Sequence, residues 1–225
     1  MKVIVTCGPS YEPIDEVRRL TNFSTGRLGI ALANALVQNG WEVLCLKGDQ
    51  ATCADPLYGS QFRTFSTNQN LVDQLLGLSQ GSSIHAVFHA AALCDFRVSR
   101  VVDSNGKPVS SPKYSTRNGE LSLVLQPTVK VLPLLRNWFP QAKLVGWKYE
   151  LSGTVQDALA MAHQQLKDCQ TDACVLNGAA YGPGFALCEK EGQVTRWPDL
   201  AALTQGLVQW LRGNDPFLNE SKPLH

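Results

Sequence analysis

The stretch TGRLGIALANALVQNGWEVLCLKG, residues 25–48, decides the fold class of this chain. Residues 25–40 place apolar side chains at three- and four-residue spacings, which is typical of a helix with one buried face, and Gly40 suits the end of that helix. The run WEVLCLKG (41–48) is typical of a strand, as is the β-branched run KVIVTCG (2–8). Together these segments predict a β-α-β unit with parallel strands and a right-handed connection.

The same alternation of apolar runs and helical patterns continues toward the C-terminus. Strands are expected at residues 62–66, 85–92, 120–126, 142–150 and 173–179, and helices at 67–79, 127–139, 154–169 and 199–213. A hairpin is expected over 185–197, with its turn at Glu191 and Gly192. We therefore predict an α/β fold, a doubly wound, mostly parallel Rossmann-like sheet with flanking helices and a small β-hairpin near the C-terminus.

The domain organisation follows from this pattern. Residues 1–213 are expected to form a single Rossmann-like domain, and residues 214–225 a C-terminal tail. Residues 94–119 show no firm helix or strand pattern, so a long loop is expected there. A mostly basic loop fits closure over a polyanion, and the alternative is a solvated surface loop. Its charged residues include Asp95, Arg97, Arg100, Lys107, Lys113 and Arg117.

Composition and charge limit the partners of the chain. It has 225 residues with 20 basic and 19 acidic side chains and a net charge of +1, so no overall field attracts it to nucleic acid or to a membrane. We therefore expect neither of these as a partner. The seven cysteines form no C-x-x-C pair, which fits a reducing compartment. Because the N-terminus carries no signal-like apolar region, a cytoplasmic location is expected.

The stretch TNFSTGRLG (21–29) lies where a nucleotide-binding fold would place its phosphate loop. Gly26 and Gly29 supply the second half of the dinucleotide fingerprint G-x-G-x-x-G, but Ser24 stands where its first glycine would be. A helix that begins here directs free N–H groups outward, which suits phosphate oxygens, and Gly26 would let the backbone approach them. The alternative is a plain helix N-cap with glycines kept for packing.

Hydride transfer with a nicotinamide cofactor, by a reductase or epimerase of the extended Rossmann type, is the first alternative function. Such an enzyme needs an acidic residue at the end of the second strand, but Asp49 comes one residue late and follows Lys47 closely. The connection from the first strand to the helix is too long for the tight turn, and no Tyr-x-x-x-Lys pair follows the strand at 85–92. These departures weaken the interpretation as a nicotinamide-dependent enzyme, which stays open as an alternative.

A series of motifs in the same order resembles those of the phosphopantothenoylcysteine synthetases (phosphopantothenate–cysteine ligases), the C-terminal-type domain of the DNA/pantothenate metabolism flavoproteins. They cover roughly residues 3–180 and read VTCGPSYEPIDEVRRLTNFSTGRLGIALANAL, HAAALCDF, PKYSTRNGELSLVLQPTVKVLPLL, LVGWKYE and DACVLNGA. Each motif alone is modest, but their shared order makes the resemblance specific.

The resemblance implies a ligase of coenzyme A biosynthesis that depends on a nucleoside triphosphate, ATP or CTP. The carboxylate of 4′-phosphopantothenate attacks the α-phosphate and pyrophosphate leaves. The cysteine amine then attacks the acyl-nucleotidylate and releases the nucleoside monophosphate. Mg²⁺ would neutralise phosphate oxygens, and no side chain is expected to ligate a metal directly. The implied assembly is a homodimer in which the long loop and the partner subunit complete the phosphopantothenate pocket.

The resemblance also implies roles for residues of this chain. In catalysis it implies Asn22, Lys113 and Arg18, with Asn22 stabilising the acyl-nucleotidylate. In nucleotide binding it implies Gly8, Ser24, Gly26, Gly29, Ala91, Asp95, Trp147 and Asn177. A structural role remains the alternative for three of them, namely a surface charge at Arg18, a core position at Trp147 and a turn cap at Asn177.

The sequence departs from the family pattern at positions that bear on the choice between ATP and CTP and on whether the chain is active. Bacterial members carry a lysine-rich motif where this chain has the single Lys113, and two helix lysines where it has Gln165 and Cys169. Those lysines accompany CTP use, so the chain resembles more closely the eukaryotic, ATP-using branch. A catalytically inactive nucleotide-binding relative therefore stays open as a further alternative. The flavin-dependent decarboxylase domain that often precedes the bacterial synthetase is not found, so a stand-alone synthetase without FMN is expected.

Overall fold

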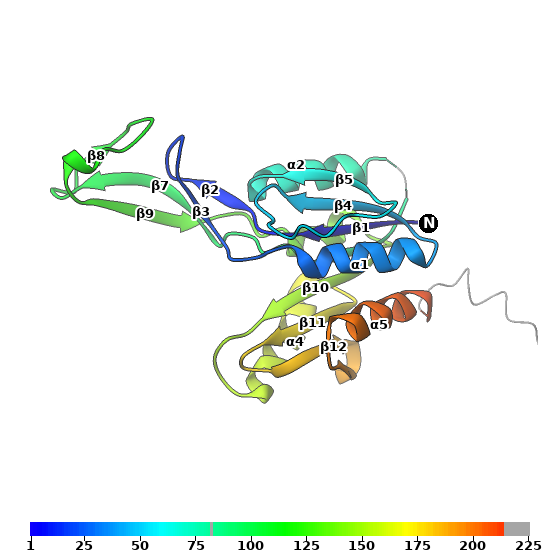
Figure 1. The fold of residues 1–225 in the computed structure, drawn as a ribbon. Helices are drawn as coiled ribbons and strands as arrows, with labels where there is room; N and C mark the ends of the chain where they lie inside the picture. Colours follow the sequence, from blue (N-terminus) through cyan, green and yellow to red (C-terminus); the bar gives the residue numbers. More distant parts are fainter. Residues whose placement is uncertain (82, 214–225) are drawn as a thin grey trace, which may run out of the picture.

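An eight-stranded sheet forms the centre of the computed structural model, which describes residues 1–81 and 83–213 (Figure 1). In spatial order its strands are β13 (Val194–Trp197), β12 (Gly182–Glu189), β11 (Ala173–Gly178), β10 (Lys143–Tyr149), β6 (Ile84–His89), β1 (Lys2–Cys7), β4 (Glu42–Gly48) and β5 (Gln61–Phe65). The strands from β11 to β5 are parallel, and β12 and β13 are antiparallel additions joined by the 3-10 turn η3 (Lys190–Gly192). The predicted doubly wound sheet with its C-terminal hairpin is confirmed.

The sequence of β1 explains its central place in the sheet. Val3, Ile4 and Val5 are fully buried, because both faces of a parallel strand are covered by helices. Successive side chains point to opposite faces, so Val3 and Val5 join one core cluster while Ile4 joins the other. Burying each of these side chains contributes about 1.5–3 kcal/mol.

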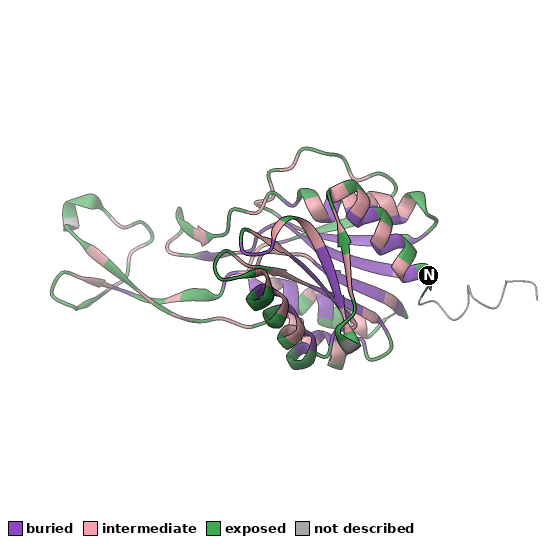
Figure 2. Cartoon of the chain, turned by 90° about the horizontal axis from the view of Figure 1, so that it is seen from below, coloured by how far each residue is buried: buried purple, intermediate pink, exposed green. Residues whose placement is uncertain are grey.

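Helices cover both faces of the sheet. The face with Val3 packs against α1 (Arg27–Gln38) and α5 (Leu200–Gly213). The other face packs against α2 (Asn68–Ser79), α3 (Leu135–Trp138) and α4 (Val155–Cys169). Figure 2 shows that the buried residues concentrate on the strands of this sheet. Of the helices in the described part of the chain, none is long and apolar enough to cross a membrane.

The long loop expected over residues 94–119 is wrong, because much of this segment forms strands. β7 (Phe96–Asp103) pairs antiparallel with β8 (Pro108–Val109) and with β9 (Leu121–Pro127), and η1 (Thr116–Asn118) precedes β9. We call residues 96–127 the arm; it projects from the body and is mostly exposed (Figures 1 and 2). Charged side chains interrupt the apolar alternation of β7, so its sequence lacks the pattern of a half-buried strand.

Two further segments differ from the sequence-based expectation. The connection from β1 to α1 contains a short hairpin of β2 (Tyr11–Pro13) and β3 (Arg19–Thr21). The helix expected at 127–139 is shorter and consists of the 3-10 turn η2 (Leu132–Leu134) followed by α3. The residues before η2 continue the pairing of β9 with β7, since Thr128 N donates to Asp95 O at 3.0 Å in the loop after β6. The expected tail at 214–225 lies outside the described residues.

Candidate functional site

The order of the strands reverses at β1. After β1 the chain moves to β4 and β5 on one side, and it then returns to β6 on the other side. In doubly wound sheets, the loops beyond the carboxyl ends of the strands diverge at such a point and create a ligand site. We call residues 8–10 after β1, residues 22–29 at the start of α1 and residues 90–95 after β6 the switch-point loops.

Hydrogen bonds hold the switch-point loops side by side. Ser10 N donates to Ala92 O at 3.2 Å, and Ala92 N donates to Gly8 O at 2.9 Å. The buried Ser10 hydroxyl accepts from Cys94 N at 2.8 Å and donates to Asn68 Oδ1 at 2.6 Å. The backbone of these loops is therefore fixed in the free protein, which lowers the cost of ordering a site when a ligand binds.

Glycines let the backbones at the switch point pack closely. Gly8 and Gly26 have φ of +79° and +81°, which glycine adopts far more readily than other residues. A Cβ added at Gly8 would lie 2.7 Å from Ala51 Cβ, and one added at Gly48 would lie 2.2 Å from Pro9 O. These glycines therefore bring the loop after β1 close to the end of β4 and to Ala51. The sequence pattern pointed to Gly8 and Gly26 but missed Gly48, although both Gly8 and Gly48 stand at the end of a strand.

The N-terminus of α1 belongs to the same loops. Gly26 is its N-cap, and the Thr25 hydroxyl beside it accepts from Arg27 N at 3.3 Å, so one N–H of the first turn is already engaged. Its first turn holds no acidic residue, which leaves free N–H groups and the positive end of the helix dipole there. A Cβ added at Gly29 would lie 2.2 Å from Cys7 Cβ, so Gly29 lets the helix pack against β1.

Asn22 connects two of the switch-point loops. Its Nδ2 donates to Ala92 O at 3.1 Å and to Leu93 O at 2.9 Å. Both amide hydrogens are thus engaged by the loop after β6, 70 and 71 positions away along the chain. An intermediate that receives a hydrogen bond from Asn22 must take over one of these two bonds.

A cavity of about 230 Å³ lies beside the loop after β6. Ala91, Asp95 and Trp147 line it, so the structure brings these three predicted residues together. The Asp95 carboxylate forms an ion pair with Lys130 at the exposed side of the cavity, and both side chains are mostly exposed. Lys130 was not predicted, because a lone lysine before a helix carries no pattern that points to a site.

Trp147 contributes to the cavity mainly through its position on β10. Its indole packs against the core beside α1 and α5, which supports the alternative that it is a core residue. Its carbonyl accepts from Gln165 Nε2 at 3.3 Å. Within the described chain, the buried indole Nε1 has no hydrogen-bond partner. Asn177 ends β11 at the same edge of the sheet, and its carbonyl accepts from Glu150 N at 2.9 Å.

His89 is a cavity residue that the sequence did not reveal. It ends β6, is 6% exposed, and its Nδ1 lies 2.8 Å from Thr6 Oγ1. Burial lowers the pKa of His89 from 6.5 to about 4, so the imidazole is neutral at neutral pH. A histidine inside an apolar strand has no distinctive sequence pattern, and only the fold shows that it faces a cavity.

Two of the predicted catalytic residues do not join the switch-point loops. Arg18 lies at the tip of the β2–β3 hairpin, and Lys113 lies on the neighbouring part of the arm. β3 is extended, so at about 3.3 Å per residue the backbone of Arg18 is roughly 13 Å from that of Asn22. The structure therefore separates Arg18 and Lys113 from Asn22 and the glycines.

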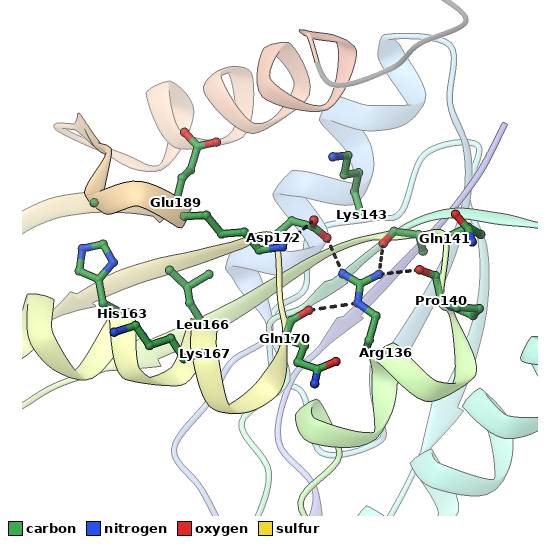
Figure 3. A pocket seen from close by; sticks show the side chains of 13 residues that line it. Arg136, Pro140, Gln141, Lys143, His163, Leu166, Lys167, Gln170, Asp172 and Glu189 are labelled. Carbon is green, nitrogen blue, oxygen red and sulfur yellow. Dashed lines mark hydrogen bonds and ion pairs between the residues drawn. The ribbon is translucent and has the colours of Figure 1, made fainter.

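A larger hollow of about 920 Å³ lies at the opposite edge of the sheet (Figure 3). No predicted site residue lines it. At its centre the Arg136 guanidinium donates to the carbonyls of Gln170, Phe139, Pro140 and Ala142 and pairs with Asp172 at 2.7 Å. These contacts connect the end of α4 to the segment before β10, so Arg136 has a structural role.

Comparison with known proteins adds evidence on relatives of this chain. The sequence matches the family model described as DNA/pantothenate metabolism flavoprotein C-terminal domain over residues 1–199. A curated relative, the coenzyme A biosynthesis bifunctional protein CoaBC of Bacillus subtilis (strain 168), is 32% identical over 184 residues, or 81% of this chain and 42% of that protein. The chain spans less than half the length of the curated relatives it matches.

Solved structures share the fold. The DNA/pantothenate metabolism flavoprotein from Streptococcus pneumoniae has a TM-score of 0.84 at 22% identity, with 96% of this chain and 100% of that chain covered. A mutant of Cab2 in complex with phosphopantothenate-cysteine has a TM-score of 0.75 at 20% identity, with 99% and 89% covered. At these identities the likeness concerns the fold.

Proposed function

We infer the function from the premise that this chain belongs to the family of the DNA/pantothenate metabolism flavoprotein C-terminal domain, whose model it matches over residues 1–199. The Bacillus subtilis relative is named for coenzyme A biosynthesis, and the Cab2 mutant holds phosphopantothenate-cysteine. We propose that the chain is a phosphopantothenate–cysteine ligase of coenzyme A biosynthesis. The observation that carries the proposal is the meeting of Gly8, Gly26, Asn22 and the loop 90–95 at one switch point.

The proposed reaction has two steps. A carboxylate is a poor electrophile, so the carboxylate of 4′-phosphopantothenate first attacks the α-phosphate of a nucleoside triphosphate, and the bond to pyrophosphate breaks. The cysteine amine then attacks the carbonyl of the acyl-nucleotidylate, loses a proton and expels the nucleoside monophosphate. The protein's task in both steps is to hold the reacting groups in line and to stabilise negative charge.

The nucleotide is proposed to lie across the carboxyl ends of the strands. Its phosphates would rest against Gly8 and Gly26, near Ser24 and the N–H groups of the first turn of α1. Gly29 acts indirectly, because it sets how closely α1 approaches β1. Its nucleoside would extend past Ala91 and Asp95 toward Trp147 and Asn177, which stand at the ends of β10 and β11.

Asn22 is proposed to act at the reacting centre. Its Nδ2 donates to two carbonyls of the loop after β6, so Asn22 connects residues 22–29 with residues 90–95. Transfer of one Asn22 hydrogen bond from a carbonyl to the acyl-nucleotidylate would stabilise the negative charge that develops when the cysteine amine attacks it. Such an exchange costs little, because one hydrogen bond replaces another.

Mg²⁺ is proposed to arrive with the nucleotide. Among the described residues there is no group of three or more His, Cys, Asp or Glu side chains placed to hold a metal ion. Mg²⁺ prefers phosphate oxygens and water with few protein ligands, so it can bind as a complex with the triphosphate. When bound, the ion neutralises charge on the phosphate oxygens.

The choice between ATP and CTP belongs to the finer part of the proposal. Gln165 and Cys169 line the 230 Å³ cavity at the positions where bacterial relatives are expected to carry lysines. Their lack of charge favours ATP. We also propose that the chain binds no FMN and acts in the cytoplasm.

A homodimer is the second part of the proposal. Arg18 and Lys113 lie on the hairpin tip and the arm, away from Asn22 of the same chain. A second copy related by a twofold axis would offer its own Arg18 and Lys113 to this site, and the reverse would hold for the other site. The site would then combine the switch-point loops of one subunit with the arm of the other.

The arm has an apolar face that fits a partner subunit. Val98 pairs with Leu125 and Val101 with Leu123, so these side chains share one face of the arm. Phe96, Leu123 and Leu125 are 47%, 39% and 43% exposed. Apolar groups gathered on an exposed element are typical of an interface, which supports dimerisation through this face.

Pyrophosphate release tests the proposed activity. Purified protein is incubated with Mg²⁺, 4′-phosphopantothenate and cysteine, in parallel with ATP and with CTP. We expect pyrophosphate release that requires 4′-phosphopantothenate, with faster turnover for ATP. No release with either nucleotide would contradict the proposal. Nucleotide binding without release would indicate an inactive relative, and tight NADPH binding without ATP or CTP binding would indicate a reductase.

A further inference from the structure

We propose that Asp15 is a positioning residue, which joins the β2–β3 hairpin to the arm and thereby fixes the orientation of Arg18 and the place of Lys113. The catalytic consequence rests on the proposed function, whereas the joint itself is a property of the fold. The sequence analysis assigns no role to Asp15, which lies in the segment EPIDEVR.

The Asp15 carboxylate bonds two segments at once. Oδ1 accepts from Val17 N at 3.0 Å and from Arg18 N at 2.7 Å, which shapes the tip of the hairpin. Oδ2 accepts from Tyr114 N at 3.2 Å and pairs with Arg18 Nη2 at 2.8 Å. One side chain therefore connects the hairpin with a segment 99 positions away along the chain.

The environment of Asp15 keeps this joint charged. Its side chain has no exposed surface, whereas that of Arg18 is 46% exposed. Burial opposes the charged form, but the amides of Val17, Tyr114 and Arg18 and the Arg18 guanidinium outweigh it and hold the pKa of the Asp15 carboxyl below its ordinary value. Charge-assisted hydrogen bonds to an ionised carboxylate are stronger than neutral ones.

The joint orients the Arg18 guanidinium through one of its three nitrogens and, in the described part of the chain, leaves the other two free to donate hydrogen bonds. Nη2 pairs with Asp15 and also donates to Tyr114 O at 2.5 Å, so both contacts use one nitrogen. Within residues 1–81 and 83–213, Nε and Nη1 of Arg18 have no hydrogen-bond partner. A guanidinium fork held at one nitrogen and open at two is ready to bind an anionic group of a substrate.

Lys113 depends on the same joint because it directly precedes Tyr114. A second main-chain bond lies beside it, from Glu16 N to Pro112 O at 3.0 Å. The Ser111 hydroxyl donates to Lys113 O at 2.8 Å and orders the turn before Tyr114. The hairpin and the arm thus present the two cations from adjoining positions, and loss of Asp15 would release both.

Asp15→Asn in the full-length protein tests the inference. The variant keeps the shape of the side chain but places an NH₂ group or a neutral oxygen where Arg18 and Tyr114 N need a charged acceptor. We expect the KM for 4′-phosphopantothenate to rise about tenfold or more, with the KM for the nucleotide unchanged. We also expect faster amide hydrogen exchange at residues 113–114, measured by mass spectrometry.

Asp103→Asn is the matched control on the same arm. Asp103 Oδ1 accepts from Asn105 N and Lys107 N, both at 2.9 Å, and so closes a turn much as Asp15 does. Among the described residues it has no ion-pair partner, and no proposed site residue contacts it. We expect its KM values to match those of the wild type, with exchange raised only around residues 104–107.

The outcomes separate this inference from the proposed function. A wild-type protein without ligase activity would contradict the function, while the exchange measurement would still test the joint. If Asp15→Asn raises exchange at 113–114 but leaves the KM for 4′-phosphopantothenate unchanged, the joint is structural only and the inference fails. It fails as well if the variant matches the wild type in both measurements, or if the KM values for both substrates rise together.

Discussion

The switch-point loops and the arm carry the two halves of the candidate site by opposite means. The loops rely on backbone: Gly8 and Gly26 let neighbouring segments pack closely against Ala51, and hydrogen bonds between the loops fix them beside the core. The arm and the β2–β3 hairpin beside it rely on exposed charge: Lys113 on the arm and Arg18 at the hairpin tip stand outside the core, joined through Asp15. A rigid cradle suits a phosphate chain, and a projecting arm suits delivery of charge to a neighbouring subunit.

This difference predicts how substitutions in each half of the site affect stability, chemistry and assembly. A substitution in the loops alters packing or charge inside a fixed frame, so it should affect chemistry and stability strongly. A substitution on the arm should leave the fold intact and affect assembly or substrate binding. The predictions below test that division, from the largest expected effect to the smallest.

Asn22→Asp should affect the chemistry most. A carboxylate in place of the amide loses both donors and faces the Ala92 and Leu93 carbonyls, so the acyl-nucleotidylate loses its stabilising group. We expect overall turnover to fall about 100-fold, while a first burst of pyrophosphate persists without cysteine. Rapid-quench measurement of both steps checks this. Asn34→Asp is the control, because it also loses a hydrogen bond from a side-chain amide to a carbonyl, that of Pro56. Full turnover of Asn22→Asp would remove Asn22 from the mechanism.

Gly29→Ala should destabilise the fold. The added Cβ would lie 2.2 Å from Cys7 Cβ, so α1 must move away from β1, at a cost of about 1–3 kcal/mol. Urea denaturation measures the change in the free energy of unfolding. Gly77→Ala in α2 meets nothing within 4 Å and should be neutral or stabilising by about 1 kcal/mol. Equal stability of the two variants would show that the close approach of α1 is not enforced by Gly29.

Leu125→Glu should weaken the proposed dimer without unfolding the protein. The residue is 43% exposed in the single chain, and burying such a side chain at an interface contributes about 1.5–3 kcal/mol. We expect sedimentation equilibrium to show a dissociation constant raised roughly 10- to 100-fold. Met161→Glu on α4, 47% exposed but far along the chain from the arm, should leave the dimer intact. A wild-type monomer, or an unchanged Leu125→Glu dimer, would contradict the role of the arm.

His89 should make stability depend on pH. Its pKa is lowered by burial from 6.5 to about 4, so between these values the unfolded chain binds more protons than the folded one. Stability should therefore fall as pH falls through this window, by up to about 1.4 kcal/mol per pH unit. Urea denaturation at pH 7, 6, 5 and 4 measures the slope. His89→Asn should flatten it, and an identical slope in both proteins would assign the effect to other groups.

Local pattern made much of the fold predictable. The strand 2–8, the helix that ends near Gly40 and the strand 41–48 each carry their own period, so the β-α-β unit and the parallel sheet follow from short stretches. In the arm, β7 was missed because it is exposed and pairs over distance, as Phe96 does with Pro127, whereas β9 matches the strand expected over 120–126. Exposure removes the apolar alternation that marks a half-buried strand.

The site was predictable in part for the same reason. Gly26 and Gly29 were predicted from the half fingerprint G-x-x-G, whereas Gly8, Ala91 and Asp95 were predicted from the resemblance. His89 and Asp15 could not be predicted, since their importance comes from contacts with Thr6 and with Tyr114, which are remote in sequence. The assignment of Asn22 came from resemblance, and its partners became visible only in the fold.

A mixture of two defective variants tests most directly whether the site combines the loops of one subunit with the arm of another. Arg18→Ala and Asn22→Asp are each expected to be nearly inactive alone, and they are mixed in equal amounts and allowed to exchange subunits. Half of the dimers would then be mixed, each with one intact site, so we predict recovery of about a quarter of the wild-type rate of pyrophosphate release. A mixture that stays as inactive as its components would contradict the account.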